Sequence, residues 1–148
     1  MRYFEDFHVG EVIELARYTV DQEEIISFAS QYDPQYFHCD PNAAQQSAIG
    51  GLIASGWHTC SIFMRLQCDA FLVDSASIAS PGVDEVRWIA PVHPGDTLSG
   101  TVEVFETRRS RTRPDRGIVR CHCALLNQNA DQVLTLSTAG FFSCRNKK

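Results

Sequence analysis

The sequence has no excess of positive charge, no long hydrophobic run and no cysteines with C-x-x-C spacing. Its 148 residues include 13 lysines and arginines and 18 aspartates and glutamates, whereas proteins that bind nucleic acid usually show a basic excess. No stretch reaches the roughly 18 apolar residues of a membrane span, and the acidic segment 1–8 does not resemble a signal peptide. We therefore expect a cytoplasmic protein that binds neither nucleic acid nor membranes.

The six cysteines also lack the C-x-x-C spacing that is typical of structural zinc sites. Cys121 and Cys123 would face the same side of an alternating strand without forming a usual zinc site. We interpret the cysteines as reduced thiols in the core or at the surface, and we predict no metal.

The pattern of apolar residues predicts a strand over 12–20 followed by a helix. Asp21 can act as the N-cap of this helix, and Glu24 lies three residues on, as in a capping box. Pro34 has no amide donor and restricts the residue before it, so the helix must end there. Asp40 is expected to cap a second short helix.

A longer helix is predicted from Gly56 to Val73, with apolar residues on nearly every side. Such a helix is buried all round, and at 1.5 Å per residue it would be about 27 Å long. The simplest arrangement is a single α+β domain over residues 1–148, in which an antiparallel sheet of about five strands wraps around this helix. The later strands are predicted at 83–90, 97–109, 117–126 and 133–144.

The most informative stretch for function runs from Phe28 to His38. It places the carboxylate of Asp33 five residues before the imidazole of His38, with Pro34 between them. On a continuous helix these side chains would point apart, but a turn at the proline can direct both to one point. Taken alone, the pattern is also compatible with a turn-capping aspartate and an ordinary half-buried histidine.

Three segments together resemble the MaoC-like dehydratases, an (R)-specific enoyl-CoA hydratase type of hot dog fold. They are Asp33-Pro-Gln-Tyr-Phe-His38-Cys-Asp-Pro, Gly50-Gly-Leu-Ile-Ala-Ser-Gly56 and Ala90-Pro-Val-His-Pro-Gly-Asp96, and the similarity covers nearly the whole chain. The family motif reads approximately D-x-N-P-[LIV]-H. This chain keeps the aspartate, the histidine and their spacing, but it has Gln35, Tyr36 and Phe37 in between.

The resemblance implies a hydratase or dehydratase that adds water across the double bond of a 2-enoyl-CoA, or removes it, in fatty acid metabolism. Asp33 and His38 would be the catalytic pair. The amide of Gly56, at the start of the long helix, would bind the thioester oxygen, and Phe37 would contact the substrate. Trp57 directly follows Gly56 and could line an acyl pocket, although it is more typical of a core or dimer-interface aromatic. Coenzyme A would enter as part of the substrate, and no other cofactor is implied.

Several alternatives remain open at this stage. Gly56 could serve only close packing, and Met64 stands where well-known relatives carry a serine. A hot dog thioesterase is one rival interpretation. A non-catalytic subunit that binds acyl-CoA or a partner protein is another, and Tyr36 and Met64 favour it.

Other polar residues receive more ordinary interpretations. His58 is expected to be a core histidine bonded to backbone, and His93 is expected to be exposed. The arginines of segment 108–116 are typical of a solvated hairpin end, although they could also meet the phosphates of coenzyme A. Because one sheet would leave an edge and a face uncovered, and because the family pairs in this way, we expect a homodimer or a higher homo-oligomer.

Overall fold

The computed structural model describes residues 1–145, so residues 146–148 of the predicted domain lie outside them. One strand, a helical middle and four further strands follow one another in the order expected from the sequence. The elements are the short 3-10 helix η1 (Phe4–Asp6), β1 (Val12–Thr19), α1 (Gln22–Tyr32), α2 (Tyr36–Cys39), α3 (Pro41–Gln45), α4 (Gly56–Gln67), the π-helical turn η2 (Cys68–Leu72), β2 (Ser77–Trp88), β3 (Thr97–Arg109), β4 (Arg116–Leu126) and β5 (Gln132–Ser143).

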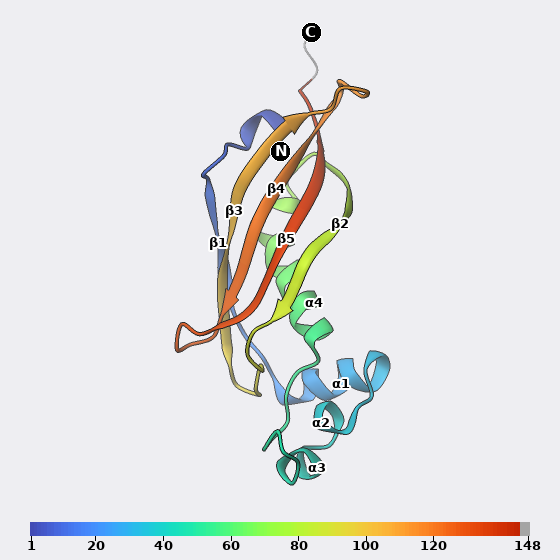
Figure 1. The fold of residues 1–148 in the computed structure, drawn as a ribbon, viewed down its shortest axis with the longest axis vertical. Coiled ribbons are helices and arrows are strands. Elements are labelled where there is room, and N and C mark those ends of the chain that lie inside the picture. The colour runs from blue at the N-terminus through green and yellow to red at the C-terminus, as the bar shows by residue number, and fades with distance from the viewer. Residues whose placement is uncertain (146–148) are drawn as a thin grey trace.

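The five strands form one antiparallel sheet in the order β1-β3-β4-β5-β2. Helix α4 runs along one face of the sheet, and α1, α2 and α3 gather beyond one end of it (Figure 1). The predicted α+β architecture, with a sheet of five strands around a central helix, is therefore confirmed.

Strand β2 begins earlier than predicted, at Ser77 instead of Val83. The added residues include Pro81 and Gly82, which do not alternate in polarity and therefore gave no strand signal. An edge strand can hold a proline because one of its sides makes no ladder hydrogen bonds. β2 is such an edge, since it pairs with β5 alone, and its side chains are almost all exposed.

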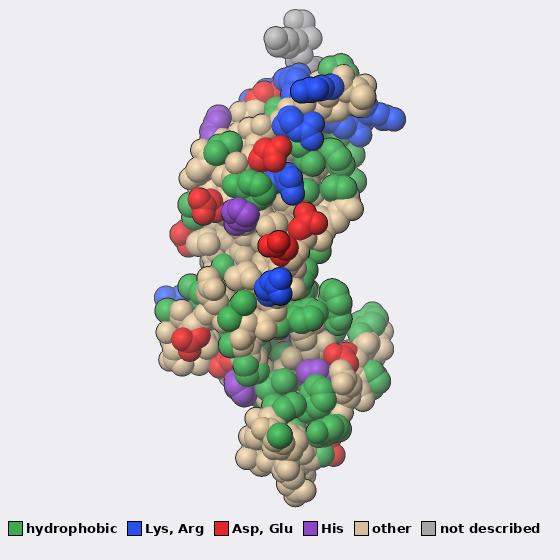
Figure 2. Space-filling view, viewed as in Figure 1, with side chains coloured by type: hydrophobic (Ala, Val, Ile, Leu, Met, Phe, Trp, Pro, Cys, Tyr) green, Lys and Arg blue, Asp and Glu red, His purple; other side chains and the backbone are tan. Residues whose placement is uncertain are grey.

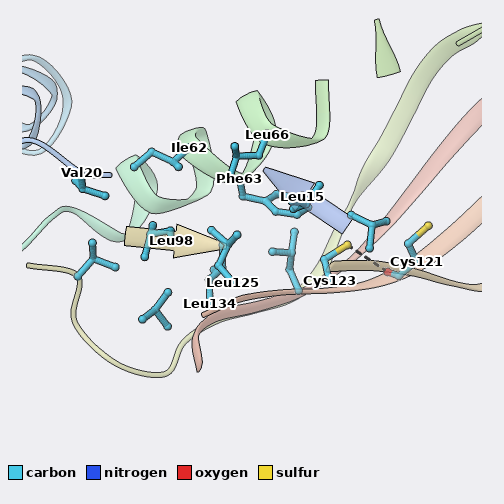
Figure 3. Packing of buried hydrophobic residues seen from close by; sticks show 14 of the residues in the cluster. Leu15, Val20, Ile62, Phe63, Leu66, Leu98, Cys121, Cys123, Leu125 and Leu134 are labelled. Carbon is cyan, nitrogen blue, oxygen red and sulfur yellow. Dashed lines mark hydrogen bonds between the residues drawn. The ribbon is translucent and has the colours of Figure 1, made fainter. Parts of the chain in front are cut away.

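The core lies between α4 and the sheet (Figure 3). Leu98, Leu125 and Leu134, one from each of the three inner strands, have no solvent exposure. They belong to the same buried cluster as Ile62 and Phe63 of α4. Each such side chain contributes roughly 1.5–3 kcal/mol by leaving water, so this layer fixes the position of α4 on the sheet.

The central helix differs from its prediction in two ways. It is α-helical only as far as Gln67 and continues through Leu72 as a π-helical turn. It is also not buried all round, because Trp57 is 60% exposed and Met64 is 49% exposed. These two side chains lie on the face of α4 that borders a cavity, and the sequence pattern alone could not show that this face lacks a covering element.

The segment before α4 folds largely as predicted. The side chain of Asp21 caps α1 by accepting a hydrogen bond from the Glu23 amide at 3.0 Å, and α1 ends at Tyr32, before Pro34. Asp40 caps α3. Helix α2, a single turn, was not predicted, because its four residues are too few to show a helical period.

Gly100 on β3 offers a test of the sheet packing. A Cβ atom at this position would overlap the backbone oxygen of Ala124 on β4. We expect Gly100→Ala to lower the free energy of unfolding by at least about 2 kcal/mol, because a backbone atom cannot move aside, as measured by urea denaturation. Gly51→Ala is the matched control, since its nearest neighbour would lie 3.8 Å away. Equal stability of the two variants would contradict this packing.

Candidate active site

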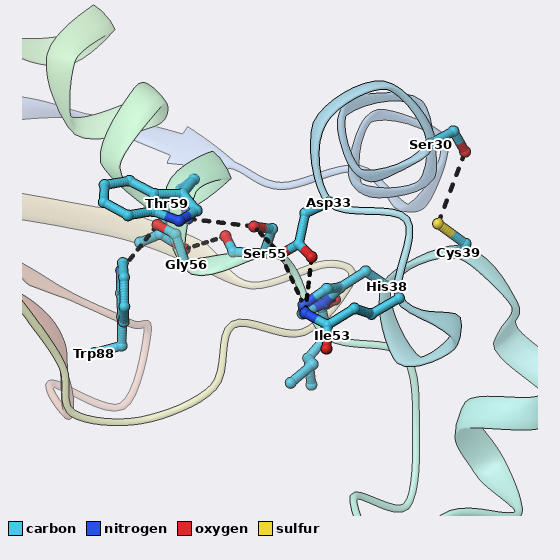
Figure 4. A network of polar contacts seen from close by, with 11 residues as sticks. Ser30, Asp33, His38, Cys39, Ile53, Ser55, Gly56, Thr59 and Trp88 are labelled. Carbon is cyan, nitrogen blue, oxygen red and sulfur yellow. Dashed lines mark hydrogen bonds and ion pairs between the residues drawn. The ribbon is translucent and has the colours of Figure 1, made fainter.

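Asp33 and His38 lie side by side at the junction of α1 and α2. Asp33 is the C-cap of α1, and His38 lies on α2, beyond the turn at Pro34. Oδ2 of Asp33 is 3.4 Å from Nε2 of His38. The structure therefore brings together the two residues that the sequence selected, and the close-up view shows their side chains pointing toward one another (Figure 4).

Two side chains hold the Asp33 carboxylate. Gln35 Nε2 donates to Oδ1 at 2.8 Å, and Ser55 Oγ donates to Oδ2 at 2.7 Å. The hydrogen bonds from Gln35 and Ser55 lower the pKa of Asp33 below its ordinary value of 3.8, and the nearby His38 adds to this, while partial burial opposes it. The carboxylate is therefore ionised at neutral pH and able to accept a proton.

His38 is fixed by its other ring nitrogen. Nδ1 lies 2.6 Å from the carbonyl oxygen of Ile53, and because a carbonyl oxygen can only accept, Nδ1 must carry a hydrogen. Nε2 is then the nitrogen that faces Asp33 and can take up or release a proton. His38 keeps only 5% of its solvent exposure. The Phe37 ring packs edge-on against the imidazole, with 4.5 Å between the two ring centroids.

Gly56 is the first residue of α4, directly beyond Ser55. Ser55 caps the helix by accepting from the Trp57 amide at 3.3 Å. The amide of Gly56 donates to no partner within residues 1–145, so it is one of the free N–H groups of a helix N-terminus. Trp88 Nε1 donates to the Gly56 carbonyl at 2.9 Å, and a Cβ at this position would overlap the Trp88 ring.

The position of Gly56 therefore satisfies both sequence interpretations, because the glycine permits close packing and also leaves an amide free. Its amide begins α4 next to Ser55, which touches Asp33. An acid/base pair and a helix N-terminus thus meet at one place.

Ser55 and Gln35 are the residues that sequence reasoning missed. In the sequence Ser55 stood out only as part of the segment that ends at Gly56, and Gln35 only as a departure from the family motif. Ser55 is completely buried, and both donate to Asp33. The only signal for Ser55 was its place before Gly56, and its contact with a residue 22 positions away could not be read from the sequence.

An apolar cavity of ≈ 360 Å³ follows α4 away from this site. Trp57 and Met64 line it, whereas Phe37 packs against His38 and the core. Carbon and sulfur atoms dominate its surface. The other lining residues include Phe7, Cys60, Phe63, Gln67, Phe71, Val83, Val86, Leu136 and Thr138.

His58 does not have the partner that was predicted for it. It is 97% buried, with 3% of its exposure left, but its Nε2 lies 3.1 Å from Glu24 Oε1 rather than from a backbone atom. Tyr18 donates to the same oxygen at 2.6 Å, and this bond raises the pKa of Tyr18 to about 12. Glu24 thus joins β1, α1 and α4 instead of closing a capping box.

The remaining polar residues lie away from the pair. His93 is 51% exposed, as expected. The arginine-rich loop at 108–116 lies at the end of the sheet opposite α1, α2 and α3 (Figure 1), where basic side chains gather on the surface (Figure 2). All six cysteines are unpaired. None of the helices among residues 1–145 combines the length and the hydropathy of a membrane span.

Comparison with known proteins identifies the family. The model of the MaoC like domain family matches residues 6–121, which include the Asp33 and His38 pair and the whole of α4. The chain belongs to the MaoC-like family.

Individual relatives agree with this assignment. The uncharacterized protein YdeM of Bacillus subtilis is 30% identical over 129 residues, which cover 87% of this chain and 90% of that protein. The crystal structure of a MaoC-like dehydratase from Rhodospirillum rubrum is similar with a TM-score of 0.89 and 39% identity, and the match covers 98% of this chain and 99% of that one.

An (R)-hydratase from A. caviae shares the fold at lower identity. Its TM-score is 0.75 at 22% identity, with 92% of this MaoC-like chain and 97% of that chain covered. These likenesses confirm the hot dog fold, and they give the chain the fold of the hydratases and dehydratases of this family.

The hydrogen bond from Gln35 leads to a prediction about Asp33. We expect Gln35→Ala to raise the pKa of Asp33 toward 3.8, because this bond is the largest cause of the depression. Ionised Asp33 contributes stability that is present above its ordinary pKa and is lost as the pH falls through the lower folded value. In Gln35→Ala the loss should be smaller and should be complete at a higher pH, because the folded pKa of Asp33 lies closer to its ordinary value.

A carboxyl NMR titration of Asp33 would measure this shift. Gln46→Ala, at the exposed end of α3, is the control and should leave the titration unchanged. An unaltered Asp33 titration in Gln35→Ala would show that the bond does not hold the carboxylate.

Proposed function

We propose that this protein is a hydratase that adds water to a 2-enoyl-CoA thioester, or a dehydratase that removes it from a 3-hydroxyacyl-CoA. The observation that supports this most directly is the 3.4 Å approach of Asp33 Oδ2 and His38 Nε2 beside the free amide of Gly56. Membership of the MaoC-like family supports hydro-lyase chemistry.

Hydration needs a group that takes a proton from water, a group that gives one to the substrate, and a donor for the charge on the thioester oxygen. In our proposal one water lies between Asp33 and His38. Its oxygen bonds to Cβ while the pair accepts one of its hydrogens, and a proton from the pair is delivered to Cα. H and OH have then been added across the double bond, and the pair has returned to its starting state.

The thioester oxygen would accept a hydrogen bond from the Gly56 amide. Negative charge on this oxygen during the reaction is stabilised by the partial positive charge of the α4 N-terminus. The acyl chain would then extend past Trp57 into the apolar cavity, whose volume of ≈ 360 Å³ lies within the usual range for small-molecule sites. Coenzyme A would remain on the solvent side.

A homodimer is part of this proposal. The edge strand β2 exposes Ile78, Val83 and Trp88 by 42%, 52% and 47%, and α4 exposes Trp57 and Met64. An unpaired edge next to exposed apolar side chains favours association with a second copy. The absence of a membrane-spanning helix from the described residues and the acidic composition are compatible with the cytoplasmic location that we propose.

A spectrophotometric assay tests this function. Incubation with a panel of 2-enoyl-CoA thioesters should bleach the absorbance of the conjugated thioester without releasing free thiol. His38→Ala and Asp33→Asn should each lower kcat/KM at least roughly a hundredfold, the usual contribution of a positioned acid or base. His93→Ala, which changes an exposed histidine outside the site, is the control and should retain activity.

The other outcomes separate the rival functions. Release of thiol would favour a thioesterase, which directs water at the carbonyl carbon. Binding of acyl-CoA without either reaction would favour a non-catalytic acyl-CoA subunit. Full activity in His38→Ala would remove the catalytic pair from the mechanism.

A further inference from the structure

Gln67 places a polar side chain on the wall of the largely apolar cavity beside α4. It ends α4, keeps only 6% of its exposure and lines the cavity beside the helix. Its amide makes no hydrogen bond within residues 1–145, unlike the buried Ser55, which bonds to Asp33. Its neighbours along the same face of α4 are Cys60, Phe63 and Met64.

The polar atoms of Gln67 are not among the fully buried side-chain atoms that lack a partner within residues 1–145. The amide therefore keeps contact with the solvent of the cavity that it lines. Because Gln67 presents this amide on the cavity wall, a ligand in the cavity can replace the water that hydrogen-bonds to it. A carboxamide both donates and accepts hydrogen bonds, so it suits a neutral oxygen.

We propose that the cavity takes an acyl chain that carries a hydroxyl or carbonyl oxygen, and that this oxygen hydrogen-bonds to Gln67. The inference rests on the proposed function, because it places the thioester at Gly56 and the acyl chain in the cavity. Gln67 would then determine specificity, while Asp33 and His38 perform the reaction.

The cavity also limits the acyl groups that it can accept. None of its lining residues is charged, so a carboxylate at the end of the chain would be buried without a counter-charge, which is strongly unfavourable. Gln67 is eleven residues beyond Gly56 on α4, about 16 Å away at 1.5 Å per residue. The oxygen is therefore expected far from the thioester, on a chain of medium length.

Pairs of medium-length 2-enoyl-CoA thioesters that differ only in a terminal hydroxyl or methyl group would test this. Across a series of chain lengths, we expect wild-type protein to prefer the hydroxylated member of at least one pair by roughly tenfold or more in kcat/KM. Gln67→Met should abolish or reverse that preference. Met64→Leu, an apolar exchange on the same cavity wall, is the control and should affect both members of a pair alike.

Binding of the corresponding saturated acyl-CoA pairs, measured by calorimetry, separates this inference from the proposed function. These ligands cannot be hydrated, so a hydroxyl preference that depends on Gln67 would support the inference even if no turnover occurred. Hydration without any hydroxyl preference, or a preference that survives in Gln67→Met, would overturn the inference and leave the hydratase intact. Failure of both saturated ligands to bind would overturn it as well.

Discussion

The hydrogen bond between Ser55 and Asp33 is the contact on which the rest of the site depends. It joins the C-terminal end of α1 to the residue that caps α4, with Oγ and Oδ2 at 2.7 Å. This bond links the carboxylate directly to the N-terminus of the central helix. Packing against the sheet fixes the position of α4. The hydrogen bond from Ser55 then sets where Asp33 lies relative to α4.

The histidine is anchored to the same part of the chain. Ile53, two residues before Ser55, accepts the bond from His38 Nδ1 and donates its own amide to the Phe37 carbonyl at 3.1 Å. The segment that leads into α4 therefore sets the position of both members of the pair. This arrangement leaves Nε2 of His38 and Oδ2 of Asp33 facing one point, which is the geometry that shared proton transfer to and from a water requires.

Local signals in the sequence were sufficient for much of this structure. Asp21, Pro34 and Asp40 set helix ends through their own backbone chemistry, and the alternation within 97–109 predicted β3 with its observed bounds. Contacts between segments that lie far apart in the sequence could not be predicted from it. The donation from Ser55 to Asp33 and the bond between Glu24 and His58 depend on how α1 packs against α4, and no local pattern encodes that packing.

The measurement that tests this account most directly is the kcat of Ser55→Ala with a 2-enoyl-CoA that the wild-type protein hydrates. If Ser55 positions Asp33, kcat should fall at least roughly tenfold while circular dichroism shows the fold retained. Ser61→Ala changes an exposed serine on the same helix, whose hydroxyl donates to the Trp57 carbonyl, and should keep wild-type kcat. Wild-type kcat in Ser55→Ala would contradict the central role of this hydrogen bond.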